Sequence, residues 1–340
     1  MKLKMLIKYI ATITLIILVL VACSSEDDDK DDETLTQTSI QFSWLHTSEF
    51  AGFYEAVDKG YYAEENLKLR LDGGGFDAEG NYIAPILRVL NGQADFGVAG
   101  SDVLMQARAQ GHPVVAIAAI FQRNPVMLVS LADKNIRLPQ DLIGKNIGID
   151  APGTATYIVY RAFMASQGIS ISDVTEIAQK PPLDPLIAGE IDVRTGFITN
   201  QPVVLQQMGY KVNVIFPNEY GIDFYSNVIF TTKDTIANRP ELVEKFLHAT
   251  IRGIDGALDD PKHAAELSVS YNSDLELDSE LQSMQASTSL IKSPGMQTGM
   301  MEASVWEMAH QIMLDQGILS EPMDYEAAFT LDFLNKIYDQ

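Results

Sequence analysis

The sequence is poor in the residues that build metal, redox and nucleophilic sites. Its 340 residues include one cysteine, Cys23, so no disulfide bond can form within the chain. The five histidines include no pair at the spacing typical of zinc ligands. A G-x-S-x-G nucleophile elbow and a phosphate-binding loop ending in Gly-Lys-Ser/Thr are also absent. We therefore expect no metal site, no cofactor and no enzyme.

Positive charge is also scarce. Lysine and arginine number 24 against 46 aspartates and glutamates, which gives a formal net charge of −22. Such a field repels nucleic acids and anionic lipid surfaces. We expect no nucleic-acid partner, and the net charge carries no information about the fold.

The start of the chain has the organisation of a signal peptide. Lys2, Lys4 and Lys8 precede an apolar run from residue 10 to residue 21. A charged start, a short apolar segment and a small residue before a cleavage point are typical of secretory signals. A membrane-spanning helix wants about 20 apolar residues. We therefore predict that residues 1–22 are removed, with an uncleaved anchor helix as the alternative.

The residues around the predicted cleavage point resemble the bacterial lipobox. Leu20-Val21-Ala22-Cys23 ends on the chain's one cysteine, and the resemblance implies lipidation of Cys23. Residues 23–37 would then form a lipidated, acidic tether, because runs of like charge without apolar residues stay extended. We expect a bacterial protein held by lipid at the extracytoplasmic face of the cell membrane.

Beyond the tether, short apolar strands alternate with amphipathic helices. This order predicts an α/β fold with largely parallel, buried sheets. Ser101 or Asp102 is a candidate cap for the helix that follows the third strand. From Pro240 onward the pattern is mainly helical. The predicted strands lie at residues 40–44, 67–71, 94–99, 114–120, 127–131, 144–149, 212–216 and 227–230.

One short pattern occurs twice. Residues 91–96 (NGQADF) match residues 188–193 (AGEIDV) in kind: a helix end, a glycine, a polar and an apolar residue, an aspartate and a strand. The repetition predicts two similar α/β halves in series.

Three stretches combine polar or aromatic side chains with strand ends, where ligands bind in open α/β sheets. Trp44, His46 and Phe50 follow the first strand, and either ligand stacking or core packing would account for Trp44 and His46. Residues 153–157 (GTATY) open a helix and suit either a polar ligand or simple capping by Thr154. Residues 196–202 (GFITNQP) follow another strand and present two side-chain amides.

The chain resembles the substrate-binding proteins of ABC importers. The similar branch is the one shared by binders of thiamine pyrimidine precursors and binders of nitrate, sulfonates and taurine. The resemblance covers about residues 40–233, in order. Its motifs are Ala51–Ala56 (AGFYEA), Lys59–Tyr62 (KGYY), Gly92–Val98 (GQADFGV) and Ala119–Pro125 (AIFQRNP).

The resemblance implies a type II periplasmic-binding-protein fold, with two α/β lobes joined by a two-strand hinge. Residues 38–126 plus 231–340 would form lobe one, and residues 127–230 lobe two. A ligand would sit in the cleft between them, and hinge closure is the expected motion. The ligand-binding positions implied by the resemblance and the strand ends are Trp44, His46, Phe50, Ser101, Asp102, Gln122, Thr154, Thr156, Tyr157, Phe197, Asn200, Gln201 and Tyr225.

The resemblance also implies a function. We expect a monomeric, lipid-anchored component that delivers a small heterocycle to an ABC permease and its ATPase. A thiamine pyrimidine precursor is the first ligand expected. Related sequences often read Asn-Glu-Pro where this chain has Asn200-Gln201-Pro202, and an amide both donates and accepts. Riboflavin is therefore the second ligand expected, with nitrate or a sulfonate less favoured. The competing class is a pyrimidine-synthase-like enzyme, whose fungal members use a cysteine-rich segment.

Overall fold

Two five-stranded mixed sheets organise the chain. The computed structural model describes residues 35–150, 154–179 and 183–339. The predicted signal peptide, Cys23, most of the predicted tether and Gly153 lie outside the described residues. Residues 37–340 form one compact unit. Within the described part, no helix is both long and apolar enough to cross a membrane.

The first sheet has the strand order β2-β1-β3-β10-β4. β1 and β3 are parallel, whereas β10 runs antiparallel to both β3 and β4. The strands are buried for most of their length, as expected for a sheet covered on both faces. They are β1 (Thr36–Gln41), β2 (Leu67–Asp72), β3 (Phe96–Ala99), β4 (Val114–Ala119) and β10 (Val228–Thr232).

The second sheet repeats this plan with the order β7-β6-β8-β5-β9. β6 is parallel to β7 and β8, and β5 is antiparallel to β8 and β9. Each sheet therefore carries one antiparallel strand next to its central parallel strand, which confirms the expected α/β class with two similar halves. The strands are β5 (Val126–Leu131), β6 (Asn146–Ile149), β7 (Thr175–Ala178), β8 (Val193–Phe197) and β9 (Val212–Ile215).

The chain passes between the sheets twice, through residues 120–125 and residues 216–227. The predicted division into lobes remains a prediction, with one detail changed. Residues 228–230, placed in lobe two by the sequence, pair in the first sheet. Phe230 lies between Gly97 of β3 and Ala116 of β4, so β10 occupies an interior position of the sheet, where both of its edges have hydrogen-bond partners.

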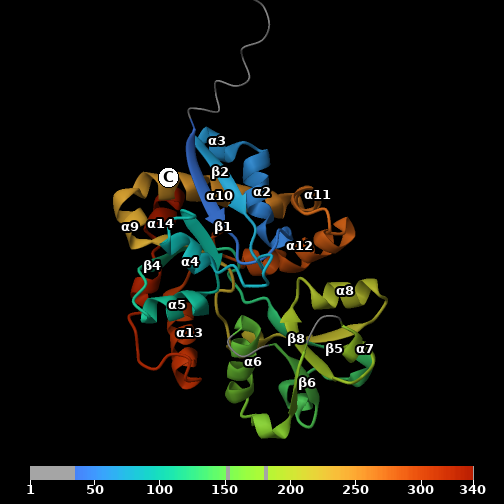
Figure 1. The fold of residues 1–340 in the computed structure, drawn as a ribbon. Helices are drawn as coiled ribbons and strands as arrows, with labels where there is room; N and C mark the ends of the chain where they lie inside the picture. Colours follow the sequence, from blue (N-terminus) through green and yellow to red (C-terminus); the bar gives the residue numbers. More distant parts are fainter. Residues whose placement is uncertain (1–34, 151–153, 180–182, 340) are drawn as a thin grey trace, which may run out of the picture. The chain divides into compact units, whose positions relative to one another are not determined.

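Helices from both ends of the chain surround the first sheet, and helices from the middle surround the second (Figure 1). The early helices are α2 (Ala51–Asp58), α3 (Tyr61–Glu64), α4 (Pro85–Leu90) and α5 (Ser101–Ala109). The middle helices are α6 (Ala155–Ser166), α7 (Asp184–Ile187) and α8 (Gln201–Gln207). The late helices are α9 (Lys233–Asn238), α10 (Pro240–Asp259), α11 (Pro261–Tyr271), α12 (Leu277–Ile291), α13 (Ala303–Asp315) and α14 (Asp332–Tyr338).

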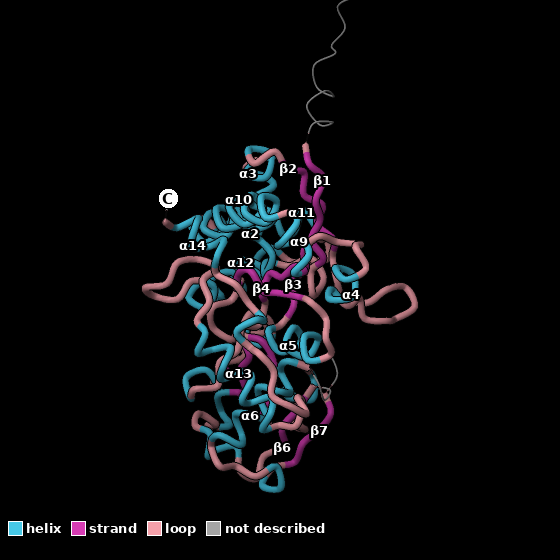
Figure 2. Tube along the Cα trace, turned by 90° about the vertical axis from the view of Figure 1, so that its left-hand side faces the viewer, coloured by secondary structure: helices cyan, strands magenta, loops and turns pink. Residues whose placement is uncertain are grey.

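Helices α2 and α10 are far apart in the sequence but cross at very short range (Figure 2). A Cβ at Gly253 of α10 would lie 2.1 Å from the carbonyl oxygen of Gly52 in α2. Only glycine allows the two backbones to approach this closely. Gly52 belongs to the AGFYEA motif, so its presence there is explained by helix packing.

The repeated aspartates anchor the central strand of each sheet to the parallel strand beside it. In the first sheet the Asp95 amide donates to Ser39 O (3.2 Å), and the Ser39 amide donates to the Asp95 carboxylate (3.1 Å). In the second sheet the same pair of bonds joins Asp192 and Asn146, at 2.8 and 3.1 Å. The repeated sequence pattern thus encodes one structural device, used once in each sheet.

The charge environment of Asp192 gives this device a pH dependence. Burial raises the pKa of Asp192, but the Asn146 amide and the Lys134 ammonium, 3.0 Å away, outweigh burial and lower it below its usual value. A carboxylate with a lowered folded-state pKa stabilises the fold above its unfolded pKa of about 3.9 and loses that contribution at lower pH.

We expect Asp192→Asn to lower the free energy of unfolding by about 1.5–3 kcal/mol at pH 7, the range for a hydrogen bond to a charged group. The difference from the wild-type protein should shrink as the pH falls from 5 to 3. Urea unfolding at each pH measures it, with Asp133→Asn, an exposed neighbour, as the control. A difference that is constant across this range would contradict the assignment.

Candidate functional site

The segment after β1 is pressed against the segment after β2. The Gly74 amide donates to Trp44 O (2.7 Å), and a Cβ at Gly74 would lie 2.4 Å from Phe42 O. This close backbone contact directs the Trp44 side chain outward, where it is 45% exposed and meets Phe76 edge to face at 5.8 Å. Of the two alternatives left open by the sequence, the core position is excluded for Trp44.

His46 lies on the other side of the same segment. Its Nδ1 is 3.1 Å from the hydroxyl of Tyr54, and its ring stacks on Tyr271 with centroids 5.6 Å apart. Burial lowers the pKa of His46, although the carboxylate of Asp72 raises it. The imidazole is therefore neutral at pH 7, and its orientation is set by Tyr54.

Phe50 belongs to the hydrophobic core in this structure, and its predicted contact with a ligand stays a prediction. Its side chain is fully buried and stacks on Phe42 with centroids 4.1 Å apart and planes inclined by 3°. The helical spacing that placed Phe50 beside Trp44 in the sequence carries it to the inner face of the segment, because the chain turns there in a short 3-10 helix (Ser48–Phe50).

Glu49, on the opposite side of this turn from Phe50, joins segments of both sheets. Its carboxylate accepts from Thr199 Oγ1 (3.2 Å), which follows β8, and is hydrogen-bonded to the side chain of Asn227, which precedes β10. Burial and the nearby Glu280 raise the pKa of Glu49, and the bonds from Thr199 and Asn227 offset part of this effect. Neither Glu49 nor Glu280 is among the residues that the sequence singled out.

Thr199 is held from two sides. Besides donating to Glu49, it accepts through its backbone carbonyl from Ser283 Oγ of α12. Ser279, one turn earlier on α12, donates to Gln207 Oε1 of α8 at 2.9 Å. These bonds connect α8, which packs on the second sheet, to elements that pack on the first. They are the direct side-chain link that an opening of the two sheets would break.

Ser101 and Asp102 open α5 and are almost completely buried. The helix cap is Gly100 and has no side-chain cap bond, so the expectation that Ser101 or Asp102 caps this helix is wrong. Ser101 Oγ and Asp102 Oδ2 have no hydrogen-bond partner within the described residues. Burial raises the pKa of Asp102. Buried polar atoms without partners are rare in native proteins and call for an explanation.

Gln122 has a structural role, and its predicted contact with a ligand stays a prediction. Its amide nitrogen donates to Gln297 O (2.6 Å) and Met300 O (3.3 Å), and its oxygen accepts from the Ser293 amide (2.8 Å). The side chain is buried, and three backbone groups depend on it. Gln122 therefore ties the connection between the sheets to the loop after α12.

The side chains predicted to bind a ligand at the start of α6 make hydrogen bonds within the protein. Thr154 accepts from the Tyr157 amide at 3.4 Å, as its predicted capping role requires. Thr156 Oγ1 donates to the Asp150 carboxylate at 2.6 Å, and the Tyr157 hydroxyl accepts from Arg161 at 3.0 Å. Thr156 is buried and Tyr157 half-buried, so Tyr157 has the more accessible side chain of the two.

The predicted residues after β8 are divided between structure and surface. Gln201 Oε1 accepts from the Phe197 amide at 2.8 Å, and a Cβ at Gly196 would lie 2.2 Å from the same oxygen. While Gln201 Oε1 accepts this bond, the side-chain nitrogen of Gln201 is left to donate to another group. Asn200, just before α8, is exposed, and Phe197, the last residue of β8, is half-buried.

Tyr225 is also buried, and its predicted role as a ligand contact stays a prediction. Its hydroxyl accepts from the Glu302 amide at 2.6 Å, and its ring packs against Trp306 with centroids 5.9 Å apart. Burial raises the pKa of its phenol. Tyr225 connects residues 216–227 to the helix α13, a relation of distant segments that no local pattern indicates.

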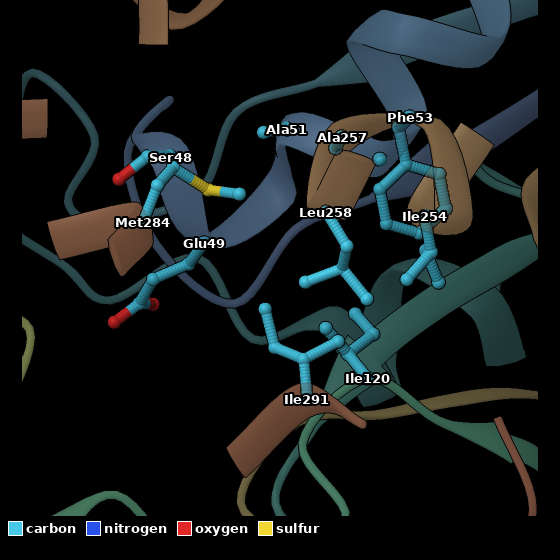
Figure 3. Close-up of a pocket in the computed structure, with 11 residues that line it drawn as sticks. Ser48, Glu49, Ala51, Phe53, Ile120, Ile254, Ala257, Leu258, Met284 and Ile291 are labelled. Carbon is cyan, nitrogen blue, oxygen red and sulfur yellow. The ribbon is translucent and has the colours of Figure 1, made fainter. Parts of the chain in front are cut away.

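A small cavity lies behind Glu49 (Figure 3). Phe53, Ile254 and Leu258 line one side, while the carboxylate of Glu49 points away from them. The cavity has a volume of about 10 Å³, which is room for about one water molecule. It is therefore a packing defect between α2, α10 and α12 and cannot hold a ligand of several rings. No cluster of three or more His, Cys, Asp or Glu suited to a metal was found in the described ranges.

Comparison with known proteins gives the family. A family model described as NMT1/THI5 like matches residues 47–264, well over half of the chain. A riboflavin-binding protein of Chloroflexus aurantiacus is 28% identical over 88% of this chain and 87% of its own length. A formylaminopyrimidine-binding protein of Halalkalibacterium halodurans is 22% identical over 88% of this chain and 91% of its own length. The expected family resemblance is thus confirmed.

The comparisons also bear on the fold and on the competing class. The aliphatic sulphonate-binding protein of Escherichia coli superimposes with a TM-score of 0.68 at 12% identity, covering 86% of this chain and 91% of its own. This confirms the expected periplasmic-binding-protein fold. Two further relatives are named as 4-amino-5-hydroxymethyl-2-methylpyrimidine phosphate synthases, so the relatives include enzymes as well as binding proteins.

The structural role of Gln122 leads to a stability prediction. We expect Gln122→Ala to lower the free energy of unfolding by about 1–3 kcal/mol, the penalty for leaving a buried polar group unpaired. Urea unfolding measures this, with Gln206→Ala, an exposed glutamine on α8, as the matched control. Equal stability of the two variants would show that the three backbone groups do not depend on Gln122.

Glu49 should give a pH dependence of the opposite sign to Asp192. Its folded-state pKa is raised, so ionisation costs stability, and the free energy of unfolding should fall as the pH rises from the ordinary Glu pKa through the raised one. Glu49→Gln keeps an oxygen for Thr199 and removes this loss. We expect this variant to gain stability over wild type between pH 4 and pH 8. Glu219→Gln, on the surface, should show no such gain.

Proposed function

We propose that this chain, which belongs to the NMT1/THI5-like family, is the extracytoplasmic substrate-binding component of an ABC importer. It captures a small aromatic heterocycle with a pyrimidine-type edge. Such an edge is shared by a thiamine pyrimidine precursor and by riboflavin, the two ligands expected from the sequence. The relatives that bind riboflavin and formylaminopyrimidine support this ligand class.

One observation carries the proposal: an exposed tryptophan and buried polar atoms without partners follow two neighbouring parallel strands, β1 and β3, at the same end of the first sheet. Trp44 offers an indole face, on which a flat ring can stack. Ser101 Oγ and Asp102 Oδ2 have no hydrogen-bond partner within the described part of the chain. A heterocycle has a flat apolar face and a polar edge, and it would satisfy both features together.

The state of Asp102 favours a heterocycle over a simple anion. Burial raises the pKa of this carboxyl, and a protonated carboxyl donates one hydrogen bond while its other oxygen accepts. A ring edge that alternates donors and acceptors matches this pair of functions. Nitrate or a sulfonate offers acceptors alone and cannot donate to the accepting oxygen of a protonated Asp102, so both ligands are less favoured.

We further propose that the protein binds its ligand without transforming it. The sequence has one cysteine, Cys23, so a synthase that relies on a cysteine-rich segment has no counterpart in the folded part. A lipid on Cys23 and the acidic segment after it would keep a monomer close to the permease and its ATPase. Recovery of a bound ligand with unchanged mass supports this class, whereas a changed mass would favour the enzyme.

Thermal unfolding of the full-length protein with a panel of pyrimidines and flavins tests the ligand class. Binding at 100 times the dissociation constant stabilises the native state by about 2.7 kcal/mol. We expect at least one pyrimidine or flavin to raise the melting temperature, and nitrate and ethanesulfonate to leave it unchanged. Unchanged melting with every heterocycle would refute the proposal.

Trp44 should be required for that stabilisation. We expect Trp44→Ala to weaken binding by about 1–3 kcal/mol, the range for stacking of a base on an aromatic side chain. Trp44→Phe should retain most of the affinity, and Leu138→Ala, which truncates an exposed leucine elsewhere, should retain all of it. An unchanged ligand affinity in Trp44→Ala would remove Trp44 from the site.

A further inference from the structure

A short hairpin brings two more exposed aromatic side chains to Trp44. Phe76 and Tyr82 face each other across an isolated antiparallel bridge and are 59% and 49% exposed. Phe76 contacts both neighbours edge to face, with ring centroids 5.8 Å from Trp44 and 6.0 Å from Tyr82. With Leu45, which is half exposed, these residues form an apolar patch, here called the aromatic hairpin. Such patches on a soluble protein usually mark binding sites.

The aromatic hairpin is held rigidly. The Asp77 carboxylate accepts from the Asn81 amide (2.8 Å) and closes the turn, and the Ile83 amide donates to Gly75 O (2.9 Å) at its base. The Tyr82 hydroxyl donates to Ser43 O at 2.9 Å, which fastens the hairpin to the segment that carries Trp44. The three rings are therefore positioned before any ligand arrives, so binding costs little ordering entropy.

The aromatic hairpin and the start of α5 lie at the same end of the first sheet. β1 and β3 are parallel neighbours, and the segment that carries Trp44 follows β1 as α5 follows β3. Burial raises the pKa of the Tyr82 phenol, and the nearby carboxyl of Asp102 raises it further. The partnerless Ser101 Oγ and Asp102 Oδ2 thus have a ring of the aromatic hairpin in their surroundings. The patch combines a broad apolar surface with polar atoms at one side.

We propose that the aromatic hairpin is a second stacking surface that selects a fused-ring heterocycle, of two or three rings, over a single pyrimidine ring. The polar atoms of Ser101 and Asp102 read the pyrimidine-type edge, and Phe76 and Tyr82 cover the rings fused to it. This inference rests on the proposed function and narrows its ligand class.

A small flat ligand fits this surface better than a protein partner does. The three side chains come from two short segments and meet edge to face, at interplanar angles of 82° and 67°, so their rings do not form the single flat face that protein interfaces use. The adjoining polar atoms of Ser101 and Asp102 are buried, out of reach of a folded domain. The chain's strong negative charge favours uncharged rings over anionic ligands.

A ring series tests the proposal with the full-length protein. The probes are 4-amino-5-hydroxymethyl-2-methylpyrimidine (one ring), lumazine (two rings) and lumichrome (three rings), measured by isothermal titration calorimetry. Quenching of tryptophan fluorescence gives a second readout, because Trp306 is fully buried and Trp44 is the exposed member of the two tryptophans. We expect affinity to rise about tenfold with each fused ring, which corresponds to about 1.4 kcal/mol.

Two variants separate stacking from folding effects. Phe76→Leu keeps an apolar side chain but removes the ring, and it should reduce the gain between one and three rings by about tenfold while leaving affinity for the single pyrimidine unchanged. Tyr82→Phe keeps the ring and removes the bond to Ser43, and it should preserve the gain. Leu138→Ala is the surface control, and unchanged melting temperatures show that each variant is folded.

The possible results distinguish this inference from the proposed function. If the single pyrimidine binds as tightly as lumichrome, or if Phe76→Leu weakens all three probes equally, the inference is overturned and the function stands. If Phe76→Leu binds every probe normally but impairs uptake by cells, the aromatic hairpin contacts the permease and the inference is again overturned. If no probe binds the wild-type protein, both fail.

Discussion

Asn124 holds together the two connections between the sheets, and the relation of the two sheets depends on this residue. Its amide donates to the Asp223 carboxylate (2.8 Å), its side-chain nitrogen donates to Phe224 O (3.0 Å), and its side-chain oxygen accepts from the Val126 amide (2.9 Å). Asn218 donates to its carbonyl as well, at 2.9 Å. Every one of these atoms is a directional partner, so the connections are locked to each other while bending beyond them remains free. A hinge needs this combination, because closure is useful only if it returns the same residues to the same place.

Sequence patterns predict the features that are determined by residues close together in the chain. Alternating apolar residues and turn glycines predicted most strands and helices, since those signals act over a few residues. They missed β7 (Thr175–Ala178) and placed the first strand at residues 40–44, where the structure has Thr36–Gln41. The repeated aspartates could be recognised in the sequence because Asp95 and Asp192 make the same bonds at the same place in two sheets. Trp44 was predicted as a candidate for a physical reason, its position at a strand end, although the sequence could not exclude the core.

What the sequence could not predict has a common cause, which is contact with residues far away in the sequence. Gln122 is occupied by residues 293–300, and Tyr225 by Glu302; neither partner is visible from the residues around them. Phe50 looked equivalent to Trp44 in a linear reading, yet the two point to opposite sides of one turn. Phe76 and Tyr82 do have a local signal in the sequence, because these two aromatic residues flank the Asp77–Asn81 turn. A glycine-rich stretch before them suggested only a loop.

Glu49 connects segments of both sheets, because its partners come from three places in the chain. Thr199 follows the second sheet's central strand, Asn227 lies on the returning connection, and Glu280 belongs to α12. A carboxylate whose pKa is raised by burial is a weaker acceptor when protonated, so its bond to Thr199 depends on its ionisation. The bond from Ser283 to Thr199 carries no such dependence. Thr199, which follows β8, is therefore held by one titratable bond to Glu49 and one fixed bond from Ser283.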